Sequence, residues 1–257
     1  MAKKTLDYFI QKNLQHRPYF FSFIRPQEAY LFEKYKEYCK GPILDFGCGD
    51  GFFAECIFGK RTIDIGLDVV ASRMKTAEKN NIYKKTITYD GVKIPCKKSS
   101  VQTIISNCVF EHIPHIKESL QEMNRILKPG GHLVTSVMCN TWNGNLSGKK
   151  IIGPLYVDWF NKMQEHHALY SKKQWIALFA KCGFDVVVKE DYLYEIASKK
   201  TELSHFTSLY SLFLYKLTGK WTFGLQPSQS EVKKIRNLIE NDKKNPSACF
   251  FVLRKKS

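Results

Sequence analysis

The sequence has 257 residues, of which 44% are hydrophobic, and its formal net charge is +16 at pH 7. This length suits one large α/β domain, alone or with an appended lobe, and the apolar share is enough for a substantial core. The composition excludes a collagen-like, low-complexity or mostly disordered chain.

The positive charge is compatible with an anionic partner such as nucleic acid, a membrane surface or an acidic substrate. Most basic residues occur as scattered pairs, and only the C-terminal run "RKKS" is denser. A lysine-rich solvated surface and a functional basic face are therefore both open interpretations.

The eight cysteines contain no C-x-x-C pair, which argues against a zinc site, and no metal is expected. Most of them lie within apolar runs, as buried thiols do in a reducing compartment. The N-terminus lacks the apolar segment of a signal peptide, and no uncharged run reaches the roughly 18 residues that span a bilayer. We therefore expect a cytoplasmic protein, with peripheral membrane association left open.

Residues 1–26 are aromatic and basic and are interrupted by Pro18 and Pro26, so we expect an N-terminal arm or lid. Residues 27–257 are expected to form one domain. Its cofactor half covers 27–140, and a substrate-side lid with insertions covers 141–245.

From residue 27 onward, helical and strand-like segments alternate. Helical spacing of apolar residues predicts helices over 27–40, 52–59, 71–80 and 116–131. Short apolar runs predict strands over 43–46, 62–69, 85–91, 101–113 (the last part as a loop) and 132–138. This alternation predicts a parallel sheet with helices on both faces.

The alternation stops after residue 139, where a long aromatic and glycine-containing segment follows. A helix and a strand return over 171–191, and an aromatic helical block covers 203–223. A charged helix over about 229–242 then leads to a last strand over 247–255.

The stretch "GPILDFGCGDGFF" (41–53) places three glycines after an apolar strand. Gly47 and Gly49 match the start of the dinucleotide fingerprint G-x-G-x-x-G/A, but its third position is Phe52 and the next glycine is Gly51. No Walker lysine follows, which excludes a P-loop. The turn therefore favours a cofactor other than NAD.

Three acids lie at the carboxyl ends of three successive predicted strands. Asp45 would repel a pyrophosphate but would suit a ligand ammonium, such as the amino-acid end of S-adenosyl-L-methionine. Asp68 is placed to accept hydrogen bonds from ribose hydroxyls, which would serve NAD equally, and Asp90 to accept one from the adenine amino group. Asp68 or Asp90 alone could be an ordinary helix cap. Together with the glycine turn, the three acids predict an S-adenosylmethionine site at the carboxyl edge of the sheet.

Over about residues 25–140 the chain resembles the class I S-adenosylmethionine-dependent methyltransferases, in the small-molecule group that includes ubiquinone- and sugar-modifying members. The resemblance is carried by "ILDFGCGDG", "IGLDVVASRM", "YDGVKIP", "ISNCVFEHIP" and "LQEMNRILKPGGHLVTSV". The family usually has Phe-Asp where this chain has Val101-Gln102. The resemblance implies a Rossmann-like, doubly wound, seven-stranded sheet with an antiparallel last strand and helical lid insertions.

The resemblance also implies which residues lie at the cofactor. Those expected to line it are Asp45, Gly47, Gly49, Asp68, Asp90, Gly91 and Asn107. Those expected to pack nearby are Cys48, Val69 and Phe110.

Methyl transfer is an in-line displacement in which the protein mainly aligns the acceptor with the methyl group. An oxygen or nitrogen acceptor can also need its proton removed, and histidine is the usual group. His112 follows the fourth strand, and His166 and His167 precede a segment that resembles one found after a histidine in related enzymes. These three are the candidate catalytic residues, although each could be an ordinary polar residue.

The aromatic block has two interpretations. Its apolar residues Phe206, Leu209, Tyr210, Phe213 and Leu217 recur at helical spacing and predict one apolar face. This face either packs on the sheet or over the active site, or faces lipid, because lysines flank it as in interfacial helices.

The sequence thus predicts a methyltransferase acting on a small-molecule or lipid-linked acceptor, with O-methylation favoured and peripheral contact with an anionic membrane left open. An RNA methyltransferase would use the positive charge, but no RNA-binding module is visible. An NAD-dependent oxidoreductase is disfavoured by Phe52 and Asp45. A non-catalytic S-adenosylmethionine-binding protein is a further alternative.

Overall fold

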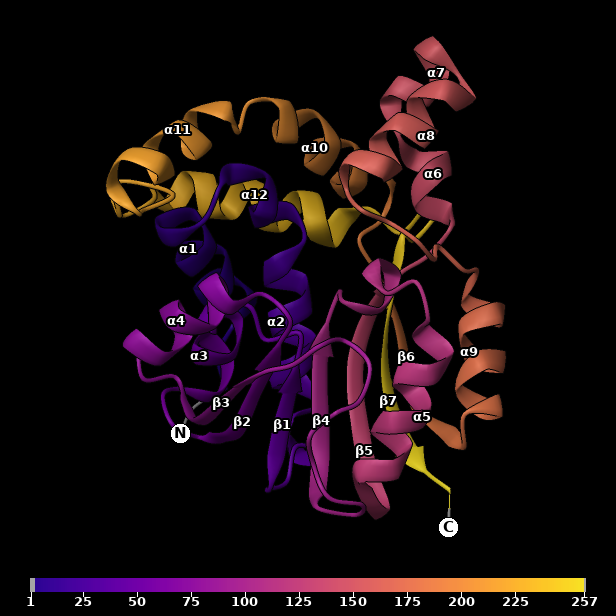
Figure 1. Cartoon of the computed structure of the whole chain (residues 1–257). Coiled ribbons are helices and arrows are strands. Elements are labelled where there is room, and N and C mark those ends of the chain that lie inside the picture. Colours follow the sequence, from indigo (N-terminus) through magenta and orange to yellow (C-terminus); the bar gives the residue numbers. More distant parts are fainter. Residues whose placement is uncertain (1–2, 257) are drawn as a thin grey trace. The chain divides into compact units, whose positions relative to one another are not determined.

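The computed structural model describes residues 3–256 and contains a seven-stranded sheet flanked by helices (Figure 1). The strands lie in the order β3-β2-β1-β4-β5-β7-β6. Strands β1 to β5 pair in parallel, and the last strand, β7, is antiparallel. The predicted doubly wound sheet is therefore confirmed, including its antiparallel last strand.

The strands agree closely with the apolar runs of the sequence. Their bounds are β1 Ile43–Phe46, β2 Ile63–Asp68, β3 Tyr83–Thr88, β4 Val101–Asn107, β5 Leu127–Met138, β6 Phe184–Tyr192 and β7 Ala248–Lys255. All four residues of β1 are buried, because neighbouring strands flank it on both sides and helices cover the sheet. Strand β3 begins and ends earlier than predicted, so Asp90 lies two residues beyond its end.

The chain divides into two compact units. The sheet unit comprises residues 35–138, 166–190 and 249–257, and the helical unit comprises residues 1–34, 139–165 and 191–248. Four α-helices belong to the sheet unit, with bounds α3 Phe52–Phe58, α4 Ala71–Lys79, α5 Ile116–Ile126 and α9 Lys172–Lys181. It also contains the short 3-10 helices η2 Lys36–Tyr38 and η3 Phe110–His112. The predicted domain boundaries at residues 26 and 140 stay predictions.

Helix α5 ends earlier than predicted. The sequence predicted that Pro129-Gly130-Gly131 stops this helix, but it ends at Ile126, and strand β5 begins at Leu127, which pairs with Val101 of β4. The residue before a proline is sterically biased towards extended backbone, and Pro129 follows Lys128. Strand pairing and this bias together override the helical spacing of the sequence.

The helical unit contains eight α-helices and one 3-10 helix within the described residues. Their bounds are α1 Leu6–His16, η1 Tyr19–Phe23, α2 Arg25–Lys34, α6 Thr141–Asn145, α7 Ser147–Ile152, α8 Pro154–Met163, α10 Glu195–Phe206, α11 Leu209–Thr218 and α12 Gln229–Asn241. Helix α2 ends before the predicted position 40. Helices α6 to α8 lie in the segment after residue 139, where the predicted alternation of strands and helices stops.

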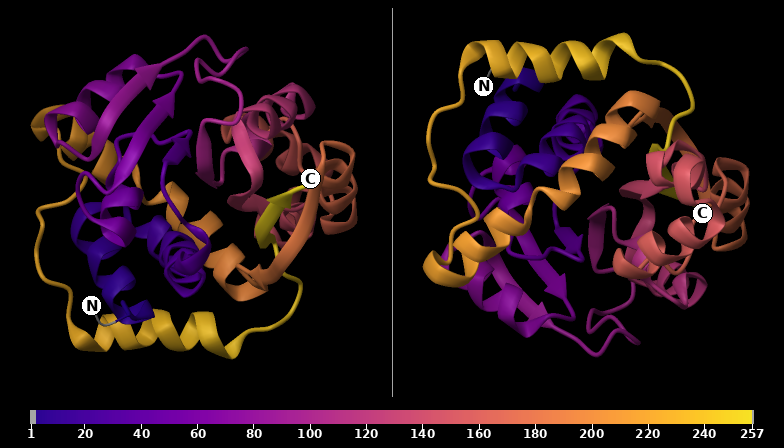
Figure 2. Two further views of the ribbon diagram at one scale, coloured as in Figure 1. Left: turned by 90° about the horizontal axis from the view of Figure 1, so that it is seen from below. Right: turned by 90° about the horizontal axis from the view of Figure 1, so that it is seen from above.

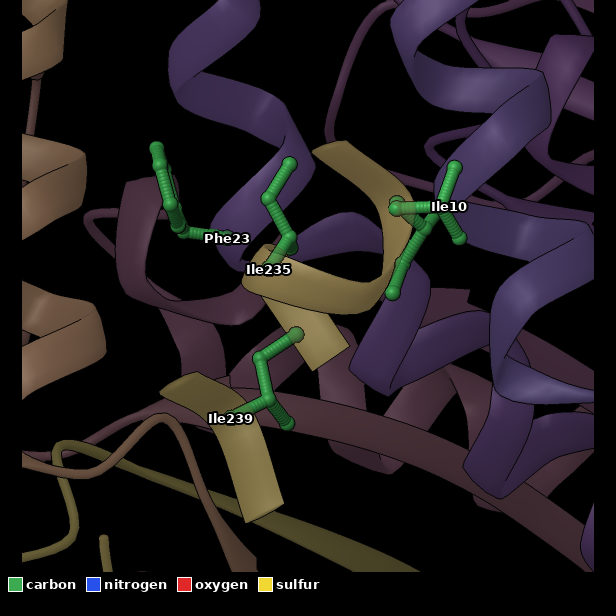
Figure 3. Close-up of a cluster of buried hydrophobic side chains, with 5 residues drawn as sticks. Ile10, Phe23, Ile235 and Ile239 are labelled. Carbon is green, nitrogen blue, oxygen red and sulfur yellow. The ribbon is translucent and has the colours of Figure 1, made fainter. Parts of the chain in front are cut away.

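Helix α12 packs alongside α1 through one apolar face (Figure 2). Val232, Ile235 and Ile239 lie on this face and contact Ile10 and Phe23 (Figure 3). The spacing of three and four residues places the α12 side chains in one stripe, and apart from Leu238 the rest of the helix is polar or charged. The N-terminal and C-terminal segments therefore share one small core.

The aromatic block is not the single helix that the sequence predicted. Helix α10 ends at Phe206, and α11 begins at Leu209. At the junction Thr207 Oγ1 donates to the carbonyl oxygen of Ser204, so a side chain competes with the helical backbone ladder. The predicted apolar face is also largely solvent-exposed, as described below.

We expect Ile235→Ala to lower the free energy of unfolding of the helical unit by about 2–4 kcal/mol, because the fully buried side chain leaves a cavity. Chemical denaturation followed by circular dichroism measures the change. Ile196→Ala on α10 is the control, since Ile196 is 48% exposed. An equal loss in both variants would contradict the role of the α1–α12 core.

Candidate cofactor site and histidine cluster

The turn after β1 is fixed by the next strand of the sheet. The N–H groups of Gly47 and Cys48 both donate to the carbonyl oxygen of Leu67, at 2.8 and 3.1 Å. Gly47 has φ +73°, and a Cβ atom there would lie 2.5 Å from a methyl of Val109. Gly51 has φ +82° and is the N-cap of α3. Glycine is therefore required by both the backbone conformation and the close packing.

Asp68, at the end of β2, connects two segments of the site. Its Oδ2 accepts a hydrogen bond from the N–H of Gly49 at 2.8 Å, and its Oδ1 accepts one from the N–H of Val70 at 2.9 Å. The side chain is buried, so both hydrogen bonds are shielded from water. Each carboxylate oxygen retains a second lone pair, which could accept from a ribose hydroxyl.

Asp45 is buried one residue before the end of β1 and accepts a hydrogen bond on Oδ2 from Tyr83 Oη at 2.7 Å. The ring of Tyr83 lies against Gly66 of β2, where a Cβ atom would be 2.6 Å from it. Burial raises the pKa of Asp45 to about 7; the Tyr83 hydrogen bond opposes this shift and the Asp68 charge adds to it. A ligand cation beside Asp45 would favour the ionised carboxylate.

Asp90 lies on an exposed turn rather than at the end of a strand. Its Oδ1 accepts hydrogen bonds from the N–H groups of Val92 and Lys93, which lower the pKa of this carboxyl. The adjacent Gly91 faces Val69, since a Cβ atom on Gly91 would lie 3.6 Å from a Val69 methyl. Val69 is 53% exposed, so these residues could form an accessible apolar contact for an adenine ring.

The end of β4 contributes Asn107, whose Oδ1 accepts a hydrogen bond from Ser136 Oγ of β5 at 2.7 Å. Cys48 and Phe110, which were predicted to pack near the cofactor, are more buried than Asn107. Cys48 is 8% exposed, with its Sγ 3.5 Å from Met74 Sδ, and burial raises the pKa of its thiol. Phe110 is fully buried, and its ring contacts those of other core aromatics. We therefore interpret Phe110 as support for the loop.

The three candidate histidines lie on two segments, His112 at the end of η3 after β4, and His166 and His167 shortly before α9. The ring centroids of His112 and His166 are 5.2 Å apart. The carbonyl oxygen of Glu111 accepts hydrogen bonds from the N–H groups of His167 and Ala168, at 2.7 and 3.1 Å. Residues 166–168 are thereby attached to the loop that also carries Val109 of the glycine turn.

The histidines differ in their electrostatic environment. Burial lowers the pKa of His166 to about 3, and His112 and His167 add to the effect because a positive charge on either opposes a second one. His166 is therefore neutral at physiological pH and can accept a hydrogen bond. His167 is exposed and His112 is partly exposed, so solvent-borne molecules can reach both side chains.

Two tyrosines of the site were not predicted from the sequence. Tyr83 holds Asp45, and Tyr89 donates its N–H to the carbonyl oxygen of Asp68 at 3.1 Å. Burial raises the pKa of Tyr89 to about 12, and the charges of Asp68 and Asp90 add to the shift. A signal for Tyr83 exists in Gly66, a glycine within a strand, which marks a place where a neighbouring group approaches closely.

Comparison with known proteins gives consistent results. A family model described as a methyltransferase domain matches residues 9–189. The chain is 32% identical over 99 residues to an uncharacterised protein of Methanocaldococcus jannaschii, covering 38% of this chain and 45% of that protein. It is 26% identical over 156 residues to malonyl-[acyl-carrier protein] O-methyltransferase of Paenibacillus, and the match covers 56% of this chain and 55% of that protein. The chain thus spans about half the length of these curated relatives.

A solved S-adenosylmethionine-dependent methyltransferase from Mesorhizobium loti has the same fold. Its TM-score is 0.56 at 16% sequence identity, and the match covers 89% of this chain and 98% of that one. The family model and the Paenibacillus relative are both named methyltransferases, and the solved structure shows the same fold.

We expect Asp68→Ala to weaken binding of S-adenosylhomocysteine about 10- to 100-fold, because hydrogen bonds to a buried charged group are worth about 1.5–3 kcal/mol. Isothermal calorimetry measures the affinity. Asp64→Ala is the matched control, since Asp64 lies on the same strand but accepts hydrogen bonds from Ile43 N–H and Lys84. Unchanged affinity in Asp68→Ala would count against a ribose role.

We expect the same affinity to depend on pH through Asp45. The carboxyl keeps its proton below about pH 7, and a ligand ammonium binds best to the ionised form. Below pH 7 binding of the ligand releases one proton, so the affinity should fall about tenfold per pH unit as the pH decreases. Above pH 7 no proton is released, and the affinity should level off.

Two variants check this assignment by calorimetry over pH 5–9. Asp45→Asn should remove the pH dependence. Tyr83→Phe should move its midpoint upward, because the lost hydrogen bond holds the pKa of Asp45 down. A midpoint that stays in place in Tyr83→Phe would exclude Asp45 as the titrating group.

Proposed function

The chain belongs to the S-adenosylmethionine-dependent methyltransferases, and we propose that it transfers the cofactor's methyl group to a small-molecule or lipid-linked acceptor, with oxygen as the favoured atom. The bound cofactor would supply an electrophilic methyl on a sulfonium. The protein's own residues would bind the cofactor, orient the acceptor and accept its proton.

The observation that carries the cofactor assignment is the buried carboxyl of Asp45 beside the glycine turn. Burial raises its pKa, and a ligand ammonium would compensate the charge that the sheet leaves unbalanced. Asp68, one strand further, has free lone pairs for hydroxyls, and Asp90 lies beyond the next strand. We assign these acids to the amino-acid, ribose and adenine parts of the cofactor respectively.

The remaining proposed cofactor contacts follow from their places in the turn. Gly47 and Gly49 allow close approach of the backbone, and Cys48 lies between them. Val69 and Gly91 would bracket the adenine, with Asn107 at the end of β4. This set shares the carboxyl edge of the sheet, where ligands of open α/β folds bind.

The histidine cluster is the proposed acceptor side of the site. His166 is held neutral by burial and by its histidine neighbours, so it would accept a hydrogen bond from the acceptor hydroxyl over the whole physiological pH range. Its low pKa makes it a weak proton acceptor, because a good general base has a pKa near the working pH. We therefore assign positioning to His166 and proton removal to His112 or His167.

Oxygen is favoured as the acceptor atom by the sequence relatives. The Paenibacillus relative is named an O-methyltransferase that acts on a malonyl group carried by acyl-carrier protein. A lipid-linked acceptor is supported by the exposed apolar side chains of α10 and α11.

Methyl transfer can be tested with isotopically labelled S-adenosylmethionine and separate pools of carboxylates, phenols, amines, isoprenoid lipids and RNA. We expect label in a carboxylate, phenol or lipid product, identified by mass spectrometry. Label only in RNA would support the rival nucleic-acid methyltransferase, and cofactor binding with no labelled product would support a non-catalytic binder.

With an acceptor in hand, His166→Gln should lower kcat about 10- to 100-fold, as loss of an aligned group does, and leave cofactor affinity unchanged. Steady-state kinetics and calorimetry measure the two quantities. His115→Gln is the matched control, because His115 is an exposed histidine just before α5 that has no assigned role. Equal rates in both variants would remove His166 from the reaction.

A further inference from the structure

Helix α11 presents an unusual surface to solvent. Among its ten residues, six large apolar side chains are each at least 39% exposed, namely Leu209, Tyr210, Leu212, Phe213, Tyr215 and Leu217. Only Leu214 of this helix is buried. Monomeric soluble proteins seldom expose so many contiguous apolar side chains, and such patches mark interaction sites.

The chain segment that contains this helix has no negatively charged residue. From Leu203 to Ser230 the sequence contains no aspartate or glutamate, while Lys216 and Lys220 are both exposed. The whole chain carries a net charge of +16. A second copy of the chain would therefore meet like charge at this surface, whereas an anionic surface would be attracted.

The end of α11 is also organised. Gly219 adopts the left-handed conformation with φ +71° and reverses the chain. Trp221 thereby stacks on Tyr215, with ring centroids 4.1 Å apart and ring planes at 14°. The ring centroids of Phe223 and Tyr210 are 6.4 Å apart. Tyrosine and tryptophan beside lysine are the residues that prefer the boundary between lipid headgroups and acyl chains.

The length of α11 distinguishes a helix that spans a bilayer from one that lies at its surface. Ten residues extend about 15 Å, half of what a bilayer core requires. None of the described helices is long and apolar enough to cross a membrane. A short helix with aromatic and aliphatic side chains and flanking lysines matches an element that lies in the plane of the interface.

We propose that α11 and the turn to Phe223 form a docking surface for an anionic phospholipid membrane. Leu209 and Phe213 enter the headgroup boundary, Tyr215 and Trp221 lie at its level, and Lys216 and Lys220 contact lipid phosphates. This surface uses none of the residues assigned to the cofactor or to proton removal, so methyl transfer does not depend on it, whereas the proposed lipid-linked acceptor rests on the same exposed side chains.

The test is sedimentation of the full chain with phosphatidylcholine vesicles that contain or lack phosphatidylglycerol. We expect binding to the anionic vesicles and a marked loss of binding at high salt. The partition coefficient should fall at least about tenfold in Leu209→Ser/Phe213→Ser, because apolar burial is lost. A similar fall is expected in Lys216→Glu/Lys220→Glu, because phosphate attraction becomes repulsion.

Matched controls carry the same chemical changes elsewhere. Lys173→Glu/Lys181→Glu alters two exposed lysines of α9 by the same charge, and Val186→Ser/Val187→Ser removes two exposed apolar side chains of β6. Both should bind anionic vesicles far better than the α11 variants. Circular dichroism confirms that each variant is folded.

Three outcomes would overturn the proposal. The first is absence of binding to anionic vesicles, or binding that the α11 variants share equally with their controls. The second is a wild-type dimer in analytical ultracentrifugation that Leu209→Ser/Phe213→Ser dissociates without affecting vesicle binding, which assigns the surface to a second copy. The third is a change of cofactor affinity in that variant without any change in vesicle binding, which assigns α11 to covering the active site.

Discussion

The carbonyl oxygen of Leu67 accepts hydrogen bonds from two successive N–H groups, those of Gly47 and Cys48, and the whole candidate site depends on this junction. It holds the end of β1 against the end of β2, so Asp45 and Asp68 approach each other across neighbouring strands. The turn can form only without a Cβ atom at Gly47, because Val109 already occupies that space. Val109 in turn directly precedes η3, which carries His112, so one contact links the glycine turn to the proposed acceptor side.

The electrostatics at the carboxyl edge of the sheet depend on burial more than on the number of charged residues. Asp45 and Asp68 share a desolvated region, and the hydrogen bonds that hold them come from a tyrosine hydroxyl and from backbone N–H groups, which carry no positive charge. Burial raises the pKa of Asp45, so the energy of its ionised form is high until a cationic ligand arrives. Such a site discriminates against anions such as a pyrophosphate and favours ligands that carry ammonium or sulfonium groups.

The sequence predicted those features of the site that depend on a few consecutive residues. Glycine spacing and strand-terminal acids predicted the turn and the place of Asp68, because both depend on a few consecutive residues. Tyr83 was missed because its contact with Asp45 requires the β2–β3 register and the gap at Gly66. The end of α5 was misplaced because strand pairing outweighed helical spacing. The periodicity of residues 206–217 predicted an apolar face but could not reveal that no core covers it, since burial is a property of the folded molecule.

The packing of Tyr83 against Gly66 has an evolutionary consequence. A side chain larger than hydrogen at position 66 would collide with the ring, because its Cβ atom would lie 2.6 Å from a ring carbon, and would displace the hydroxyl from Asp45. A larger residue at position 66 therefore requires a smaller one at position 83, which would remove the hydroxyl that donates to Asp45. Covariation of these two positions among homologous sequences would then report on the hydrogen bonding of a third residue, Asp45.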